Sequence, residues 1–310
     1  MRLIALGHVV WDHLLLLDHY PEVDSKNLAL GGRECVGGPA ARAALTAAAL
    51  DVDVCFAGCL GDDEAGARIL QAFSAGGVDT VGVEVCAGCV TPRASIWVEA
   101  RHGKRTVALD RAGLPDYPAA ALDHLPWGPG WLLLDGKEPV ALEAARRARS
   151  AGMSVLLDLG GPRVDIAPLV AAADVVAVSK AFVMDEYPGL DLLQAAANLL
   201  EAGPRLAVIT LGAGGMIVGE RVTDGCASQP FWFPAWPAGK VVDTTGAGDV
   251  FHGALAWALL QVFPTRKALA CAAVAGGLAC RDLGGVVEGL AARVLLDEVE
   301  RSAGLFGLEV

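Results

Sequence analysis

The sequence is short of basic residues. Its 310 residues contain 24 Lys and Arg against 36 Asp and Glu, a formal net charge of −12 at pH 7 with the histidines neutral. Nucleic-acid backbones and anionic membrane surfaces attract basic patches, so a chain this acidic is a poor partner for either. We therefore expect no nucleic acid and no membrane among its partners. Small anionic ligands are not excluded, because they respond to local charge.

Charged residues of both signs are scarce, at 19% of the chain, whereas hydrophobic residues make up 54%. This composition supplies a large core and excludes wholesale disorder. No run of 18 or more uncharged apolar residues occurs, so no membrane span is predicted. The apolar residues 1–7 meet His8 and Asp12 before any cleavage site, so we interpret them as a buried first strand and not as a signal peptide.

Cysteine clusters and domain linkers are also lacking. Eight cysteines are scattered through apolar surroundings in a chain too large to need disulfides, so we expect reduced thiols and a cytoplasmic protein. The closely spaced Cys86 and Cys89 have no second pair and no nearby histidine, which disfavours a zinc or redox site. Without repeats or low-complexity runs, residues 1–310 are expected to form a single domain.

Short apolar runs alternate with Ala- and Leu-rich segments, a pattern typical of a mostly parallel sheet covered by helices. The predicted strands are residues 2–9, 52–57, 131–135, 153–158, 174–178 and 205–210. The predicted helices are residues 39–50, 62–75, 138–151, 165–172, 190–202, 246–262, 265–281 and 289–300. Residues 13–36 and 91–110 break the alternation and indicate antiparallel strands with a hairpin turn, which we expect to form a lid.

The strongest chemical signal lies in residues 241–253, which pass from a β-branched stretch through Gly246-Ala247-Gly248 into a helix. The glycines permit a tight turn, and the amides that follow are unsatisfied donors at a helix N-terminus. A phosphoryl group there would face these donors and the positive end of the helix dipole. Asp249 would be placed to accept a proton from a hydroxyl, which suits phosphoryl transfer. On spacing alone, a helix cap at Asp249 and a plain turn remain an alternative.

Residues 243–249, Asp-Thr-Thr-Gly-Ala-Gly-Asp, resemble the C-terminal signature of the ribokinase (PfkB) family of carbohydrate kinases, and Gly37-Gly38 resembles its N-terminal signature. The resemblance extends over nearly the whole chain and is strongest to ketohexokinase-like and sulfofructose-kinase-like members. It implies an α/β fold of three layers, α/β/α, with a mostly parallel central sheet and a small β lid.

The same resemblance implies an ATP-dependent sugar kinase that uses ATP and Mg²⁺. Because the open edge of a two-stranded lid invites pairing, we also expect a homodimer through the lid. A nucleoside kinase of the family is the alternative within this class. From another class, a nicotinamide-dependent oxidoreductase shares the α/β pattern, but the first strand leads into residues 7–12 without a GxGxxG motif.

The resemblance also implies site residues. The catalytic base is Asp249, with the amides of Gly246, Ala247 and Gly248 as an anion hole. Expected sugar contacts are Asp12, Asp24, Gly38, Arg42, Arg105 and Lys137. Expected nucleotide contacts are Lys180, Thr210, Gly212, Gly214, Gly246, Gly248 and Gly276. Asp243 and Thr245 are expected at a monovalent cation site that would take K⁺. A plain turn at residues 210–215 and helix packing at Gly276 remain alternatives.

Two departures from the family bear on substrate and metal. Many members carry Asn for sugar hydroxyls where this chain has Arg42, and Lys26, Arg93, Arg105 and Lys137 are expected near the same end of the site. Because guanidinium groups bind phosphate, sulfonate and carboxylate bidentately, we expect an anionic sugar. The alternative is that Arg42 pairs with an acid on a solvated helix face. Residues 179–182 lack the Glu with which many members order magnesium.

Overall fold

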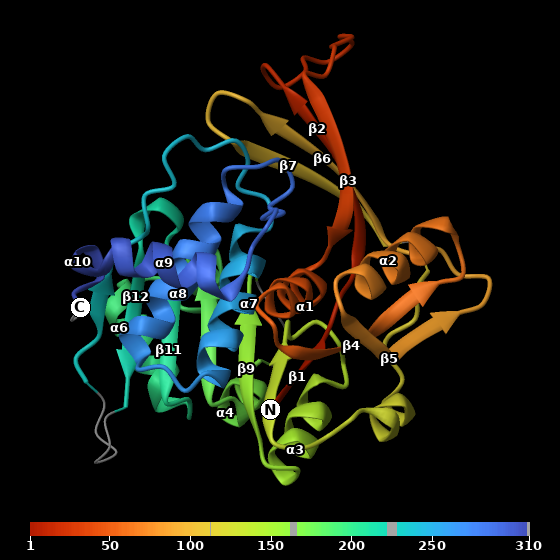
Figure 1. Ribbon diagram of the computed structural model, residues 1–310. Coiled ribbons are helices and arrows are strands. Elements are labelled where there is room, and N and C mark those ends of the chain that lie inside the picture. Colours follow the sequence, from red (N-terminus) through yellow and green to blue (C-terminus); the bar gives the residue numbers. More distant parts are fainter. Residues whose placement is uncertain (112, 162–165, 222–227, 309–310) are drawn as a thin grey trace.

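A nine-stranded sheet forms the centre of the computed structural model, which describes residues 1–111, 113–161, 166–221 and 228–308 (Figure 1). Its strand order is β13-β12-β11-β10-β9-β8-β1-β4-β5. The bounds are β1 (Arg2–Leu6), β4 (Asp53–Gly61), β5 (Val78–Cys86), β8 (Gly130–Leu134), β9 (Met153–Leu159), β10 (Val175–Ser179), β11 (Leu206–Thr210), β12 (Met216–Glu220) and β13 (Phe231–Phe233). In this spatial order, all neighbouring strands between β11 and β5 pair in parallel, whereas β12 is antiparallel to both β11 and β13.

Helices cover both faces of this sheet, which makes three layers (Figure 1). They are α1 (Pro39–Ala49), α2 (Glu64–Ala75), α3 (Ala141–Ser150), α4 (Ala167–Ala172), α5 (Lys180–Glu186), α6 (Leu192–Glu201), α7 (Ala247–Leu260), α8 (Thr265–Ala279), α9 (Ala292–Arg301) and α10 (Ala303–Phe306), with 3₁₀ turns η1 (Ala119–His124) and η2 (Gly212–Gly214).

Side-chain alternation along the strands divides the core in two. Leu3 and Ala5 of β1 belong to the cluster that includes α1, α7 and α8, whereas Ile4 and Leu6 belong to the cluster with α3 and α6. Successive side chains of a strand point to opposite faces, so fully apolar strands need cover on both sides. The predicted α/β/α layers are confirmed.

The lid is a separate four-stranded sheet that stands above the central sheet (Figure 1). Its strands, in the order β3-β2-β6-β7, are β2 (Val10–Leu17), β3 (Gly31–Gly37), β6 (Arg93–Glu99) and β7 (Lys104–Asp110). The prediction of only antiparallel strands was wrong at the centre, because β2 and β6 pair in parallel. Both strands leave the same edge of the central sheet, β2 after β1 and β6 after β5, and so run in the same direction.

The remaining predictions concern membranes and cysteines. None of the helices in the described part of the chain is long and apolar enough to cross a membrane. The seven cysteines within that part are free thiols, and Cys226 lies outside the described residues.

Candidate active site

The predicted anion loop leads into the N-terminus of α7. Gly246 precedes the helix with φ +72°, and a Cβ at this position would lie 2.6 Å from Nη1 of Arg42. Only glycine accepts both the left-handed backbone and this close approach. Among the described residues, the amides of Gly248 and Asp249 donate to no backbone carbonyl, and the space beside Gly248 is open. These free donors make the loop a ready site for an anion.

Asp243 holds this loop in shape. Its Oδ1 accepts hydrogen bonds from the Thr245 amide at 2.8 Å and the Thr245 hydroxyl at 2.7 Å, and its Oδ2 accepts from the Gly284 amide at 2.8 Å. The carboxylate is fully buried. A monovalent cation at Asp243 and Thr245 would therefore share this carboxylate with three protein donors, so potassium binding stays a prediction from the sequence.

Arg42 lies between two candidate site carboxylates. Its Nη2 donates to Asp12 Oδ2 at 2.8 Å, its Nη1 donates to the Gly284 carbonyl, and its Nε lies 3.9 Å from Asp249 Oδ2. Arg42 and Asp12 are each 5% exposed. The sequence left open whether Arg42 binds substrate or pairs with an acid on a solvated face. The structure shows pairing with an acid, but in the interior, where the guanidinium is occupied by protein groups.

The side chain of Asp249 is mostly buried but keeps some exposure to solvent. It lies in the first turn of α7, and its side chain is 24% exposed. Burial raises the pKa of Asp249 to about 6, against the opposing effect of Arg42, because a desolvated carboxylate resists ionisation. A carboxyl with such a pKa is ionised at neutral pH and basic enough to take a proton from a hydroxyl in the transition state.

The carboxyl ends of β1 and β8 form the neighbouring part of the site. The buried Asp135 accepts hydrogen bonds from the His8 amide at 2.7 Å and the Lys137 amide at 3.0 Å. A Cβ on Gly7 would overlap this carboxyl group. Gly38, which directly precedes α1, has φ +92°, and a Cβ at this position would lie 2.4 Å from the His8 carbonyl oxygen. Asp135 therefore fixes the approach of the chain segments that carry Lys137 and Gly38.

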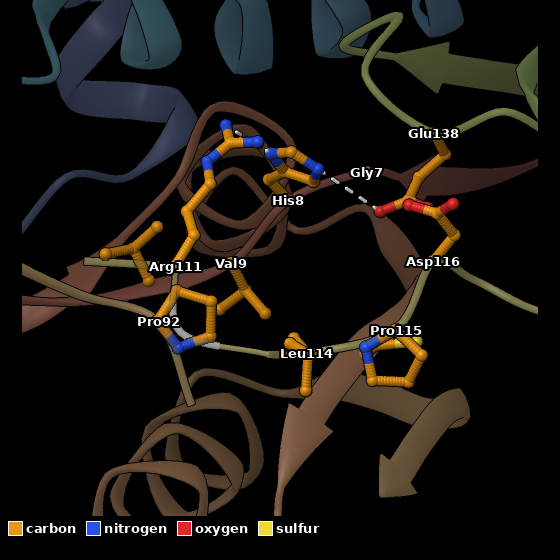
Figure 2. A pocket seen from close by; sticks show the side chains of 11 residues that line it. Gly7, His8, Val9, Pro92, Arg111, Leu114, Pro115, Asp116 and Glu138 are labelled. Carbon is orange, nitrogen blue, oxygen red and sulfur yellow. Dashed lines mark hydrogen bonds and ion pairs between the residues drawn. The ribbon is translucent and has the colours of Figure 1, made fainter. Parts of the chain in front are cut away.

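A small cavity of about 80 Å³ lies at this same edge (Figure 2). Its apolar side includes Val9, Pro92 and Leu114, and its polar side includes Arg111 and Glu138. Figure 2 shows the His8 imidazole between these two polar groups, with Arg111 Nη2 3.0 Å from Nδ1 and Glu138 Oε1 3.4 Å from Nε2. Since an arginine can only donate, Nδ1 accepts and the Nε2 proton points toward Glu138. The cavity thus offers both a cation and carboxylates.

The lid touches the anion loop through its hairpin turn. The Thr244 amide and hydroxyl both donate to the Gly103 carbonyl, at 3.2 and 3.1 Å, and Arg105 Nη1 donates to the Thr244 hydroxyl at 2.9 Å. Arg105 is thus placed beside the loop. Asp24 is not, because it is exposed in the segment between β2 and β3, which extends from the far end of the lid (Figure 1).

The predicted nucleotide contacts follow neighbouring strands β10 and β11. Lys180 is the first residue of α5 after β10, Thr210 ends β11, and Gly212–Gly214 form η2. This segment joins antiparallel β11 and β12, as the turn alternative requires, and leaves the backbone at Gly212 open. Gly276 lies within α8, where a Cβ would be 3.1 Å from the Ala247 carbonyl oxygen, so the structure agrees with helix packing there.

Acidic and imidazole groups at three places near the site were not predicted from the sequence to have a role. The first two of these places are the single carboxyl group of Asp135 and the neighbouring pair of His8 with Glu138, and the third is the buried ion pair of Asp158 with His252. Asp135 and Asp158 both stand at the carboxyl end of a predicted strand, where ligands of parallel sheets bind. That position was the available signal for them. In the described residues, no group of three His, Cys, Asp or Glu is placed to hold a metal ion.

Comparisons with known proteins agree over almost the whole chain. A family model described as pfkB family carbohydrate kinase matches residues 3–288. Aminoimidazole riboside kinase of Salmonella typhimurium is 30% identical over 264 residues, which cover 80% of this chain and 81% of that protein. Ketohexokinase of Mus musculus is 25% identical over 291 residues, which cover 90% and 96%. The structure of Arabidopsis thaliana ribokinase complexed with ribose and ATP superposes with a TM-score of 0.76 at 22% identity, over 96% of this chain and 98% of that one.

Proposed function

Because the chain belongs to the pfkB family of carbohydrate kinases, we propose that it transfers the γ-phosphoryl group of ATP to a hydroxyl of a small sugar, with Asp249 as the base. The observation that supports the role of Asp249 is its place on the first turn of α7, directly after Gly248, whose amide donates to no backbone carbonyl of the described residues. Asp249 Oδ2 also lies 3.9 Å from Arg42 Nε. A base and an anion site on one helical turn are what phosphoryl transfer to an alcohol needs.

In this mechanism Asp249 accepts the proton of the acceptor hydroxyl while the hydroxyl oxygen forms a bond to the γ-phosphorus. The bond between that phosphorus and the β,γ-bridging oxygen breaks, and ADP leaves with the electron pair. The amides of Gly246 and Gly248 would stabilise the charge on the transferring group, since the helix dipole also favours negative charge there. The Ala247 amide, which the sequence also placed in the anion hole, donates to the Thr244 carbonyl at 3.4 Å. Arg42 keeps Asp249 ionised and oriented from the interior. Mg²⁺ would enter with ATP and would supply positive charge against the phosphates. Because Mg²⁺ commonly keeps several waters as ligands, it would not require a cluster of protein carboxylates.

The nucleotide and the sugar would occupy different stretches of the same sheet edge. Lys180, Thr210, Gly212 and Gly214 follow β10 and β11, on the side where the ATP phosphates would enter. The sugar would lie toward β1 and β8, between Asp249, Lys137 and the cavity of Figure 2. The reacting hydroxyl then faces Asp249, and the remote end of the sugar faces the cavity.

We propose an anionic sugar as the acceptor, but with different receptor groups from those that the sequence favoured. Arg42 is bound to Asp12, and Arg93 pairs with Asp63 at 2.9 Å, so these two are committed to protein acids.

Three other cationic groups lie near the candidate site. Arg105 donates to Thr244 of the anion loop, Arg111 lines the cavity, and Lys137 acts on the charge of Asp249. The positive charge of Arg111 would favour a phosphate, sulfonate or carboxylate on the remote end of the sugar, whereas Arg105 and Lys137 would act at the reacting end, beside Thr244 and Asp249.

An acceptor panel with ATP and Mg²⁺ tests this function. ADP formation should depend on the sugar, and the highest kcat/KM should belong to an acidic sugar rather than to its neutral parent. Neutral hexoses that react far better than their anionic analogues would refute the acidic preference alone. Preferential phosphorylation of a nucleoside would support the nucleoside kinase alternative. If none of these acceptors stimulates ADP formation, the proposed transfer to a small sugar is contradicted.

We also propose that the lid forms a homodimer. All seven residues of the edge strand β7 are exposed, and the apolar side chains of Trp97, Val107 and Leu109 are each more than 40% exposed. An unpaired strand edge with apolar side chains favours pairing with a second copy. Light scattering should give twice the chain mass of 31.9 kDa, and Val107→Lys with Leu109→Lys should give a monomer. A wild-type monomer at tens of micromolar would contradict the proposal.

A further inference from the structure

His252 and Asp158 form an ion pair in the interior beside Asp249. His252 Nδ1 lies 3.0 Å from Asp158 Oδ2, and the two residues are 5% and 3% exposed. His252 follows Asp249 by three residues on α7, so both side chains lie on one face of the helix. Asp158 stands near the carboxyl end of β9. Neither ring nitrogen of His252 has a hydrogen-bond partner in the described part of the chain, so its contact with Asp158 is a short ion pair without an aligned hydrogen bond.

Four charged groups act on Asp249, each from a different element. Arg42 comes from α1, Lys137 from the segment after β8, Asp158 from β9 and His252 from α7 itself. Arg42 and Lys137 favour the ionised carboxylate, whereas Asp158 opposes it. When His252 is protonated, its charge balances that of Asp158. Without that charge, the Asp158 carboxylate would face Asp249 uncompensated.

We propose that His252, held as an imidazolium by Asp158, is a positioning residue that keeps the Asp249 carboxylate ionised in its desolvated site. This inference rests on the proposed function, because it assigns the pair a role only through Asp249. A buried carboxylate without a cation is strongly unfavourable, so Asp158 itself holds the proton on the ring. Burial alone would lower the pKa of His252, but the charges of Asp158 and Asp249 outweigh it and raise the pKa above the ordinary histidine value.

The charges predict a shifted pKa of Asp249 in one single variant and little change in the other. In His252→Asn the amide can still donate to Asp158 but carries no charge, so the Asp158 carboxylate raises the pKa of Asp249. In Asp158→Asn the acid is gone, and His252 loses the partner that keeps it protonated, so positive and negative charge disappear together. The double variant also lacks both charges. If the pair were purely structural, each of these changes would damage it, and the acid limb would not move in His252→Asn alone.

The experiment is the pH profile of kcat/KM for these three variants. The acid limb of His252→Asn should move upward by about 1 pH unit, whereas Asp158→Asn and the double variant should stay near wild type. Equal limbs in wild type and His252→Asn would overturn the proposal even if both enzymes are active. Loss of the acid limb in every protein, wild type included, would instead count against Asp249 as the base.

A measurement that does not depend on activity uses the wild-type protein. ¹⁵N-histidine NMR should show the His252 ring protonated on both nitrogens at pH 7.5, with the ring assigned in the wild-type protein through its contact with the Phe251 ring, whose centroid lies 5.5 Å away. A neutral His252 ring at that pH would contradict the proposal. This readout also covers the case in which a variant fails to fold.

Discussion

Asp249→Asn should remove most phosphoryl transfer and leave the fold intact. The amide has the shape of the carboxylate but cannot accept the hydroxyl proton, and loss of a general base lowers kcat by roughly 10²–10⁴-fold. Because the amides of the anion loop belong to the backbone, ATP affinity should change little. The measurement is kcat with saturating ATP and sugar, beside nucleotide binding by calorimetry. Turnover within a few-fold of wild type would contradict the role of Asp249.

The same variant should be at least as stable as the wild type at pH 7. The pKa of Asp249 is raised in the folded protein to about 6, so ionisation of this carboxyl opposes folding. The cost is absent below pH 3.8, the ordinary value, grows between pH 3.8 and 6, and is fully present above pH 6. Asn removes the cost, which is on the order of 1–3 kcal/mol with allowance for the exposed part of the side chain. A higher Tm at pH 7 that converges on wild type near pH 4 is expected.

Arg42→Met should destabilise the protein strongly. The variant leaves Asp12 buried without its cation and removes the donor to the Gly284 carbonyl. Breaking one side of a buried ion pair costs roughly 3–5 kcal/mol, a large part of the roughly 5–15 kcal/mol that keeps a domain folded. Urea unfolding measures the change in the free energy of unfolding.

Two controls separate charge from packing in this experiment. Arg93→Met breaks the ion pair of Arg93 with Asp63, in which the Arg93 side chain is 54% exposed. This change should lower the free energy of unfolding by less than about 1 kcal/mol. Arg42→Met with Asp12→Asn removes both charges and should recover part of the lost stability, since no buried carboxylate is left unpaired. If Arg42→Met costs no more than Arg93→Met, the buried pair does not stabilise the fold.

Most of the central layers could be predicted from the sequence because local patterns determine them. Fully buried strands such as β8 and β10 appear as short apolar runs, and the predicted bounds agree with the observed ones within one residue. The sheet margins could not be predicted in this way. In strand β5 only Val78 and Gly82 are buried, and polar residues interrupt its valines. Strand β13 has only three residues between prolines, so neither strand contains an apolar run long enough to predict it.

The candidate site, too, could be predicted where its residues are close in sequence and not where tertiary packing brings them together. The anion loop and Asp249 lie within seven consecutive residues, so their chemistry is visible in the sequence. The partners of Arg42 are separated from it by 30 residues at Asp12 and by 242 at Gly284, and no local pattern links them. Arg42 therefore fits a substrate receptor by residue type alone, whereas tertiary packing makes it an interior counter-ion. His252 and Asp158 are brought together in the same way.

The assignment of Asp249 as the base is decided by the pH dependence of kcat/KM for the wild type and Asp249→Asn in the same buffers. The wild type should lose activity with a single acid limb near pH 6, because protonated Asp249 cannot take the hydroxyl proton. The residual activity of Asp249→Asn should lack that limb. An acid limb of the same midpoint in both proteins would show that another group titrates and that Asp249 is not the base.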